Sequence, residues 1–290
     1  MEKERRIIIM LVNMNELLQP AKQGGYGVGF FNAVNGEMAR AVIETAEELH
    51  APVMVGTAQV LLPAMDLERV AEYLIPMAKK ASVPVCVHYD HGLTFERCME
   101  ALQLGFTSLM YDCSMEDYET NISKVAEMVK ICHAMGVTVE GELGHIGDNE
   151  GAGKLLNPSD YYTDPSMALD FVSRTNVDSL AVAVGNAHGD YKFPPKLDFD
   201  RISAISQKTR IPLVLHGGSG LSDEDFRIAV SRGICKVNIF TDIDKAGKAG
   251  VEAGIEAGEK TMMGLIPYEI EAMKKVVAEK IRLFGSENKA

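Results

Sequence analysis

Short apolar runs alternate with longer amphipathic stretches along nearly the whole chain. Several runs are apolar at almost every position, as strands covered on both faces should be. The eight runs are residues 26–31, 52–56, 83–88, 108–111, 137–142, 179–184, 211–215 and 234–239. Strands that alternate with helical patterns in this way predict βαβ units and a parallel sheet.

The segment 115–135 is the clearest predicted helix, because apolar residues recur there at steps of three and four. The residues that would form its buried face are Tyr118, Ile122, Val125, Val129 and Cys132. Similar patterns cover residues 37–49, 67–80, 95–104, 165–175, 223–232 and 242–257. Asp164, followed by Pro165, and Ser222 are typical helix-start residues.

Eight strands, most of them followed by a helix, predict an α/β fold of the closed (β/α)8 (TIM) barrel type. We expect one domain over residues 1–290, with 1–9 as an N-terminal extension ahead of a second potential start at Met10. A C-terminal helix over 267–284 would lie outside the barrel proper. A doubly wound open sheet is the competing interpretation.

The amino-acid composition limits the kinds of partner that we expect for this protein. The formal net charge of −12 argues against nucleic acid or an anionic membrane as the main partner. It leaves room for a small anionic substrate, because a few backbone N–H groups and one lysine can outweigh the global field. The five cysteines form no C-x-x-C pair, and no stretch approaches the ~20 apolar residues of a membrane span. A cytoplasmic location is therefore expected.

Three of the seven histidines fall at the ends of predicted strands. His91 follows the third strand, His188 follows the sixth and His216 ends the seventh, and a glycine comes after each. In a barrel these imidazoles would converge on one mouth and supply the ligands of a catalytic zinc site. A single histidine at such a place is more often an ordinary polar residue, but three equivalent positions favour a metal.

Two neighbouring residues leave alternatives open. His88 shares a strand face with Asp90 by alternation, so it is an alternative ligand. Glu142, at the end of the fifth strand, is either an oxygen ligand or a carboxylate that orients a histidine. Long connections at 144–162 and 187–198 would lie at the same mouth, where barrel enzymes build their sites.

At these residues the chain resembles the class II ketose-bisphosphate aldolases, the family of fructose- and tagatose-bisphosphate aldolases. The matching segments are YDHG, VEGELG, AVGNAHG, PLVLHGGSG and KVNIFTD, in this order on successive predicted strands. The resemblance covers nearly the whole chain. It implies a lyase that reversibly cleaves a phosphorylated ketose to dihydroxyacetone phosphate and an aldehyde. It also implies a homodimer or homotetramer.

The resemblance further implies particular roles. His91, His188 and His216 would bind zinc, with Glu142 as a further ligand candidate. Asp90 would handle the proton on the C4 oxygen, and Glu150 would exchange the C3 proton of dihydroxyacetone phosphate. The substrate and phosphate contacts would be Asn32, Gly189, Lys192, Gly217, Gly218, Ser219, Asn238 and Thr241. A monovalent cation near the phosphate is also allowed.

The chemistry gives independent support. Cleavage between C3 and C4 leaves an enediolate, whose charge zinc can stabilise as a Lewis acid. A lysine Schiff base is the other solution, but the one lysine near a strand end, Lys236, lies inside the eighth run with no evident partner. The N–H groups of residues 217–220 can form an anion nest, although a glycine-rich segment is also an ordinary turn. Imidazole ligands would serve cobalt or manganese as well.

Two departures from the family pattern bear on the substrate. Bisphosphate-specific members use an arginine near the C-terminus, whereas here the only arginine after Arg232 is Arg282, and Lys260 is a weak substitute. Phe240 stands where fructose-specific members carry aspartate or asparagine. The hypothesis is therefore a ketose 1-phosphate without a 6-phosphate. The alternatives are a fructose- or tagatose-1,6-bisphosphate aldolase, a zinc hydrolase on the same barrel, and a non-catalytic companion subunit.

Overall fold

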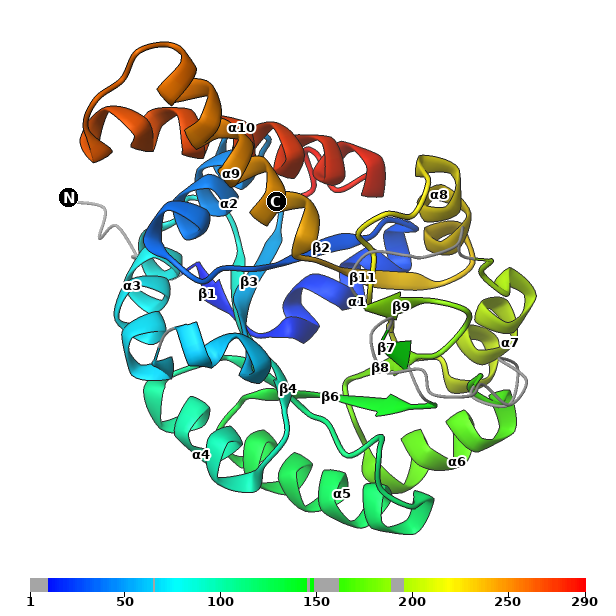
Figure 1. The fold of residues 1–290 in the computed structure, drawn as a ribbon. Coiled ribbons are helices and arrows are strands. Elements are labelled where there is room, and N and C mark those ends of the chain that lie inside the picture. Colours follow the sequence, from blue (N-terminus) through cyan, green and yellow to red (C-terminus); the bar gives the residue numbers. More distant parts are fainter. Residues whose placement is uncertain (1–9, 65, 145–146, 149–161, 189–195) are drawn as a thin grey trace, which may run out of the picture.

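A computed structural model describes residues 10–64, 66–144, 147–148, 162–188 and 196–290. Within this part, eight parallel strands close into a barrel, and helices surround it (Figure 1). The barrel strands, in the order in which they pair, are β2 (Val28–Asn32), β3 (Val53–Ala58), β4 (Val85–Gly92), β5 (Ser108–Tyr111), β6 (Thr138–Leu143), β8 (Ser179–Val182), β10 (Leu213–Leu215) and β11 (Ile234–Ile239). β11 pairs back with β2, which confirms the predicted closed barrel over the open sheet.

The helices of the outer ring confirm the predicted segments and add one that the pattern did not indicate, α7. The helices are α2 (Gly36–Glu48), α3 (Leu67–Lys80), α4 (Phe95–Leu104), α5 (Tyr118–Ala134), α6 (Pro165–Thr175), α7 (Phe199–Thr209), α8 (Asp223–Ser231) and α9 (Thr241–Glu256). The predicted starts of α6 and α8 are confirmed. Asp164 accepts hydrogen bonds from two N–H groups of α6, and Ser222 forms a capping box with Asp225.

The C-terminal helix α10 (Met262–Phe284) begins five residues earlier than expected. The side chain of Thr261 caps it by accepting a hydrogen bond from the N–H of Gly264, and the helix continues through Pro267. α10 packs against α9 and α2, outside the barrel strands. The turn that joins α9 to α10 projects beyond the ring of helices (Figure 1).

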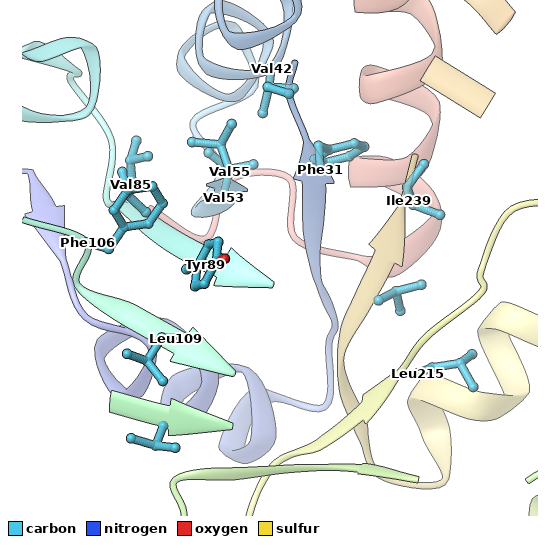
Figure 2. Close-up of a cluster of buried hydrophobic side chains, with 14 of the residues drawn as sticks. Phe31, Val42, Val53, Val55, Val85, Tyr89, Phe106, Leu109, Leu215 and Ile239 are labelled. Atoms are coloured by element: carbon cyan, nitrogen blue, oxygen red, sulfur yellow. The ribbon is translucent and has the colours of Figure 1, made fainter. Parts of the chain in front are cut away.

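The period-two alternation of the strands divides the apolar core into two parts. Outward-facing residues such as Phe31, Val55 and Tyr89 pack against the helices (Figure 2). Inward-facing residues such as Phe30 and Met54 fill the lower barrel instead. There α1 (Met14–Gly24), another helix that the pattern did not indicate, closes the barrel from below. The short strand β1 (Leu11–Val12) pairs with the start of β4.

Polar side chains replace the apolar ones toward the upper barrel. His88 and Asp90 on β4, and Glu140 and Glu142 on β6, are buried two residues apart on their strands. Each pair therefore points inward, with the second member nearer the carboxyl end. This is the end at which barrel enzymes carry their active sites. No helix in the described part of the chain is both long and apolar enough to cross a membrane.

Candidate active site

A cavity of about 410 Å³ lies at the carboxyl ends of the strands. One part of its wall is polar and carries most of the residues singled out from the sequence. These are Asn32, Asp90, His91, Glu142, Gly217, Gly218, Ser219, Asn238 and Thr241. The other part is apolar and consists of Ala58, Val60, Leu61, Leu93, Met115, Ile239 and Phe240. Phe240 thus lies at the cavity.

Asp90 and His91 are consecutive residues of β4, yet both line the cavity. Neighbours in a regular strand point to opposite faces. His91 departs from that geometry because its φ is 45°, a left-handed value that non-glycine residues seldom adopt. The register between β4 and β5 shifts between Tyr89 and Gly92 as well. Local backbone strain of this kind is found at functional sites.

The rings of His91 and His216 meet edge to face, with Nε2 of His91 2.9 Å from Nδ1 of His216. The outer nitrogen of each ring meets a carboxylate. Nδ1 of His91 lies 2.8 Å from Asp112 Oδ2, and Nε2 of His216 lies 2.8 Å from Glu140 Oε1. A carboxylate only accepts hydrogen bonds, so both outer nitrogens carry the proton and donate it. The two facing nitrogens, Nε2 of His91 and Nδ1 of His216, are then the ones left to share a proton or to bind an ion.

Asp90 is held by two amides from neighbouring strands. Nδ2 of Asn32 on β2 lies 3.2 Å from Asp90 Oδ2, and Nδ2 of Asn238 on β11 lies 3.2 Å from Oδ1. Burial raises the pKa of Asp90, but the charges of His91 and His216 outweigh it and lower the pKa overall. The side chain therefore remains a carboxylate. It also lies close enough to both histidines to share a cation with them.

The surrounding charges shift the pKa of His91 strongly. Burial alone would lower it, but Asp90, the hydrogen bond to Asp112 and the charge of Glu142 raise it to about 10. Without a metal, the ring therefore carries a proton at neutral pH. The same hydrogen bond and the charge on His91 outweigh burial at Asp112 and hold its pKa well below the usual range.

Glu142 lies beside His91 and Asp112 rather than against His216. Burial, and then the charge of Asp112, raise its pKa well above the usual value. Its Oε2 has no hydrogen-bond partner among the described residues. The histidines are oriented instead by Asp112 and Glu140, which sequence reasoning missed. Glu140 could have been found, because it precedes Glu142 by the two residues of a strand repeat.

The glycine turn after β10 lies beside the N-terminus of α9. Ser219 Oγ accepts a hydrogen bond from the N–H of Asp242 in the first turn of α9, at 3.4 Å. Phe240 precedes this helix and provides no side-chain cap. At one position of the expected anion nest, residues 217–220, the N–H of Gly218 already donates to the carbonyl of Asn238 at 3.1 Å. The helix N-terminus still offers donors and a favourable dipole for a phosphate.

Lys236 has the partners that the sequence did not reveal. Its side chain is fully buried inside the barrel, with Nζ 2.8 Å from Glu140 Oε2 and 3.4 Å from His88 Nε2. The ring of His88 bonds to Ser108 Oγ through Nδ1, below the cavity. Nε2 of His88 thus faces an ammonium, although His88, Asp90 and Glu140 also lie close enough together to hold an ion.

Several predicted site residues lie outside the part that the structure describes. They are Glu150, Gly189 and Lys192, together with the side chain of His188. The backbone of His188 belongs to β9 (Ala187–His188), which pairs with β7 (Gly147–Asp148). The roles assigned to these four residues remain predictions.

The fold and this site define a barrel enzyme with a histidine- and carboxylate-lined cavity at its carboxyl end. Comparison with known proteins identifies its family. A family model described as fructose-bisphosphate aldolase class-II matches residues 12–289. The chain therefore belongs to the class II fructose-bisphosphate aldolase family, and it is a lyase.

Individual relatives span almost the same length. A probable fructose-bisphosphate aldolase of Bacillus subtilis (strain 168) is 37% identical, over 97% of this chain and 99% of its own. A sulfofructosephosphate aldolase of Alkalicoccus urumqiensis is 38% identical, over 94% of this chain and 96% of its own. The crystal structure of the YdjI aldolase from Escherichia coli K12 is similar with a TM-score of 0.86 at 36% identity, covering 97% of this chain and 99% of that one.

Proposed function

We propose that this chain is a zinc-dependent aldolase that reversibly cleaves a ketose 1-phosphate to dihydroxyacetone phosphate and an aldehyde. The observation that carries the proposal is the pair of facing imidazole nitrogens of His91 and His216, 2.9 Å apart, each backed by a carboxylate. This second layer of carboxylates is what metal-ligating histidines commonly have. His188 is the proposed third ligand, and Glu142 is a further candidate.

The residues present fit a divalent ion. Nε2 of His91 and Nδ1 of His216 would hold it, and the carboxylate of Asp90 lies within reach of both. Zinc is the proposed ion, with cobalt or manganese as alternatives that imidazoles also accept. When bound, the ion would supply Lewis-acid stabilisation of the enediolate charge.

Asp90 is the proposed acid–base group for the C4 oxygen. Its carboxylate is unprotonated at neutral pH and is fixed by the amides of Asn32 and Asn238, so it can accept the hydroxyl proton during cleavage and return it during condensation. The Oδ1 atoms of the same asparagines have no hydrogen-bond partner among the described residues, and both side chains line the cavity. They are therefore placed to accept hydrogen bonds from substrate hydroxyls. Glu150 remains the proposed group for the C3 proton.

The phosphate is proposed to bind between the glycine turn and the start of α9. Ser219 and Thr241 line the cavity there, and the first turn of α9 offers N–H groups. Gly189 and Lys192 are proposed to contribute from the connection after β8. A monovalent cation near this phosphate is part of the same proposal.

The aldehyde end of the substrate is proposed to lack a phosphate. No lysine or arginine is among the described residues that line the cavity, and the wall near Phe240 is apolar. Arg282 pairs with Glu287 at the end of α10. Within the described part of the cavity wall, a second phosphate would therefore lack the cation that such a group needs. Fructose 1,6-bisphosphate is the second candidate, because the relative from Bacillus subtilis carries that activity in its name.

We propose a homodimer or homotetramer as the working form. Met262 and Met263 are 71% and 81% exposed at the projecting turn between α9 and α10, where a second copy could cover them. All five cysteines are free and buried, which fits a reducing, cytoplasmic location.

The experiment compares fructose 1-phosphate with fructose 1,6-bisphosphate as substrates of the zinc-loaded protein. Dihydroxyacetone phosphate released from each would be measured by a coupled reduction, with and without a chelator. We expect metal-dependent cleavage with a higher kcat/KM for the monophosphate. Comparable kcat values with a much lower KM for the bisphosphate would contradict the absence of a second phosphate site.

A further inference from the structure

A buried polar cluster lies beneath the cavity, and none of its members is among the described residues that line the cavity. It consists of Lys236, Glu140, His88 and Ser179, all of them essentially inaccessible to solvent. The ammonium of Lys236 also lies 4.6 Å from the centre of the ring of Phe30. A buried lysine costs stability unless it is paired, so the arrangement calls for an explanation.

The two oxygens of Glu140 have different partners. Oε2 accepts a hydrogen bond from Lys236 Nζ at 2.8 Å and one from Ser179 Oγ at 3.3 Å. Oε1 faces Nε2 of His216 at 2.8 Å. An ammonium can only donate, so the atom that it faces must be an acceptor. The hydroxyl of Ser179 can donate or accept and so imposes no such requirement.

We propose that Lys236 is a positioning residue that sets the tautomer of His216 through Glu140. Lys236 fixes the carboxylate, and Oε1 then requires a proton on Nε2 of His216. This leaves the lone pair on Nδ1, the nitrogen that faces His91. The inference rests on the proposed metal site, because only a metal ligand at Nδ1 makes that tautomer matter. If Lys236 served packing and charge balance alone, replacing it would not change which atom of residue 140 faces His216.

The variant Glu140→Gln separates the two explanations, because an amide has one accepting oxygen and one donating nitrogen. Lys236 would attract the amide oxygen and turn the NH2 group toward Nε2 of His216. That nitrogen would have to accept, so the proton would move to Nδ1 and block it as a ligand. Adding Lys236→Met removes the demand for an oxygen. The amide can then turn its oxygen to His216 and its NH2 group to Ser179.

The measurement is a cobalt titration of the metal-free protein, followed by visible absorption, with thermal unfolding to show that each variant is folded. We expect Glu140→Gln to weaken cobalt binding by about ten- to a hundredfold, the usual effect of losing such a partner. The double variant Lys236→Met/Glu140→Gln should bind cobalt about tenfold more tightly than Glu140→Gln. If Lys236 had a structural role alone, the double variant should bind cobalt more weakly than Glu140→Gln, since it carries the larger change.

The outcomes distinguish the inference from the proposed function. Failure of the unmodified protein to bind cobalt would overturn both. Tight binding by the unmodified protein, with the double variant no better than Glu140→Gln, would overturn the inference alone. If a variant does not fold, ¹⁵N NMR of the histidine rings in the unmodified, zinc-loaded protein tests the same point. The inference requires a proton on Nε2 of His216, and a proton on Nδ1 would contradict it.

Discussion

His91 and His216 lie 125 positions apart in the chain, yet Nε2 of the first is 2.9 Å from Nδ1 of the second. Two features bring them together. The left-handed backbone at His91 turns its ring into the mouth of the barrel, and β10 places His216 directly at its own end. Asp112 and Glu140 then hold the outer nitrogens. The predictions below depend on this pair.

Replacing His91 by alanine should abolish metal binding while leaving the fold intact. The side chain is 14% exposed and lies at the edge of the cavity, so its loss opens little space in the core. His133→Ala is the matched control, because that ring lies on α5 and pairs with Asp178. Metal content by mass spectrometry and circular dichroism would be measured for both. A fully loaded His91→Ala protein would refute the assignment.

Asp90→Ala should separate catalysis from metal binding. We expect the metal content to stay near that of the unmodified protein and the cleavage rate to fall by about 10²- to 10⁴-fold, the usual value of a general acid–base group. Asp112→Ala should instead affect mainly metal binding. We expect its metal affinity to fall by about ten- to a hundredfold, because Asp112 orients a ligand. Both rates would be measured with saturating metal. Unimpaired cleavage by Asp90→Ala would remove that residue from the mechanism.

Metal affinity should rise with pH. In the metal-free protein the pKa of His91 is raised to about 10, so the ring is protonated at neutral pH and must lose its proton to bind an ion. One proton released per ion makes the dissociation constant fall about tenfold per pH unit below that pKa, and the fall should level off as pH approaches it. Competition with a chelator of known affinity between about pH 6.5 and 8.5 would measure this. An affinity independent of pH would contradict the prediction.

Gly218→Ala should destabilise the protein and weaken phosphate binding. A Cβ at this position would lie 2.8 Å from Val237 Cγ1 and 2.9 Å from the carbonyl oxygen of Asn238, so the turn would have to shift. Overpacking of this kind typically costs about 1–3 kcal/mol. The melting temperature and the KM for dihydroxyacetone phosphate would be compared with those of Gly36→Ala, where nothing lies within 4 Å of the new methyl group. Equal melting temperatures and KM values for the two variants would contradict the close approach of the backbone at Gly218.

The barrel was predictable because its strands are apolar on both faces, a pattern that hydrophobicity alone reveals. The predicted runs 108–111 and 234–239 coincide with β5 and β11. The apolar pattern did not indicate α7 or α1. It also placed the start of α10 too late, because the helix begins at Met262, after the Thr261 cap. Boundaries of this kind depend on single side-chain hydrogen bonds, which periodicity does not report.

The site was predictable only in part. Residues at strand ends, such as His216 and Asn238, follow from topology, because the carboxyl ends of parallel strands meet at one mouth. The partnership of Lys236 with Glu140 did not follow, since it joins β11 and β6, two strands that do not pair. The inward turn of His91 depends on a register shift between β4 and β5, which no local pattern in the sequence indicates.

The most direct test of the central claim is proton exchange on dihydroxyacetone phosphate. The zinc-loaded protein would be incubated with this compound in heavy water, and loss of one C3 proton would be followed by NMR, with and without a chelator. The assay needs no knowledge of the aldehyde. We predict stereospecific exchange that stops on chelation and returns when zinc is restored. No exchange by protein shown to hold its zinc would contradict the account.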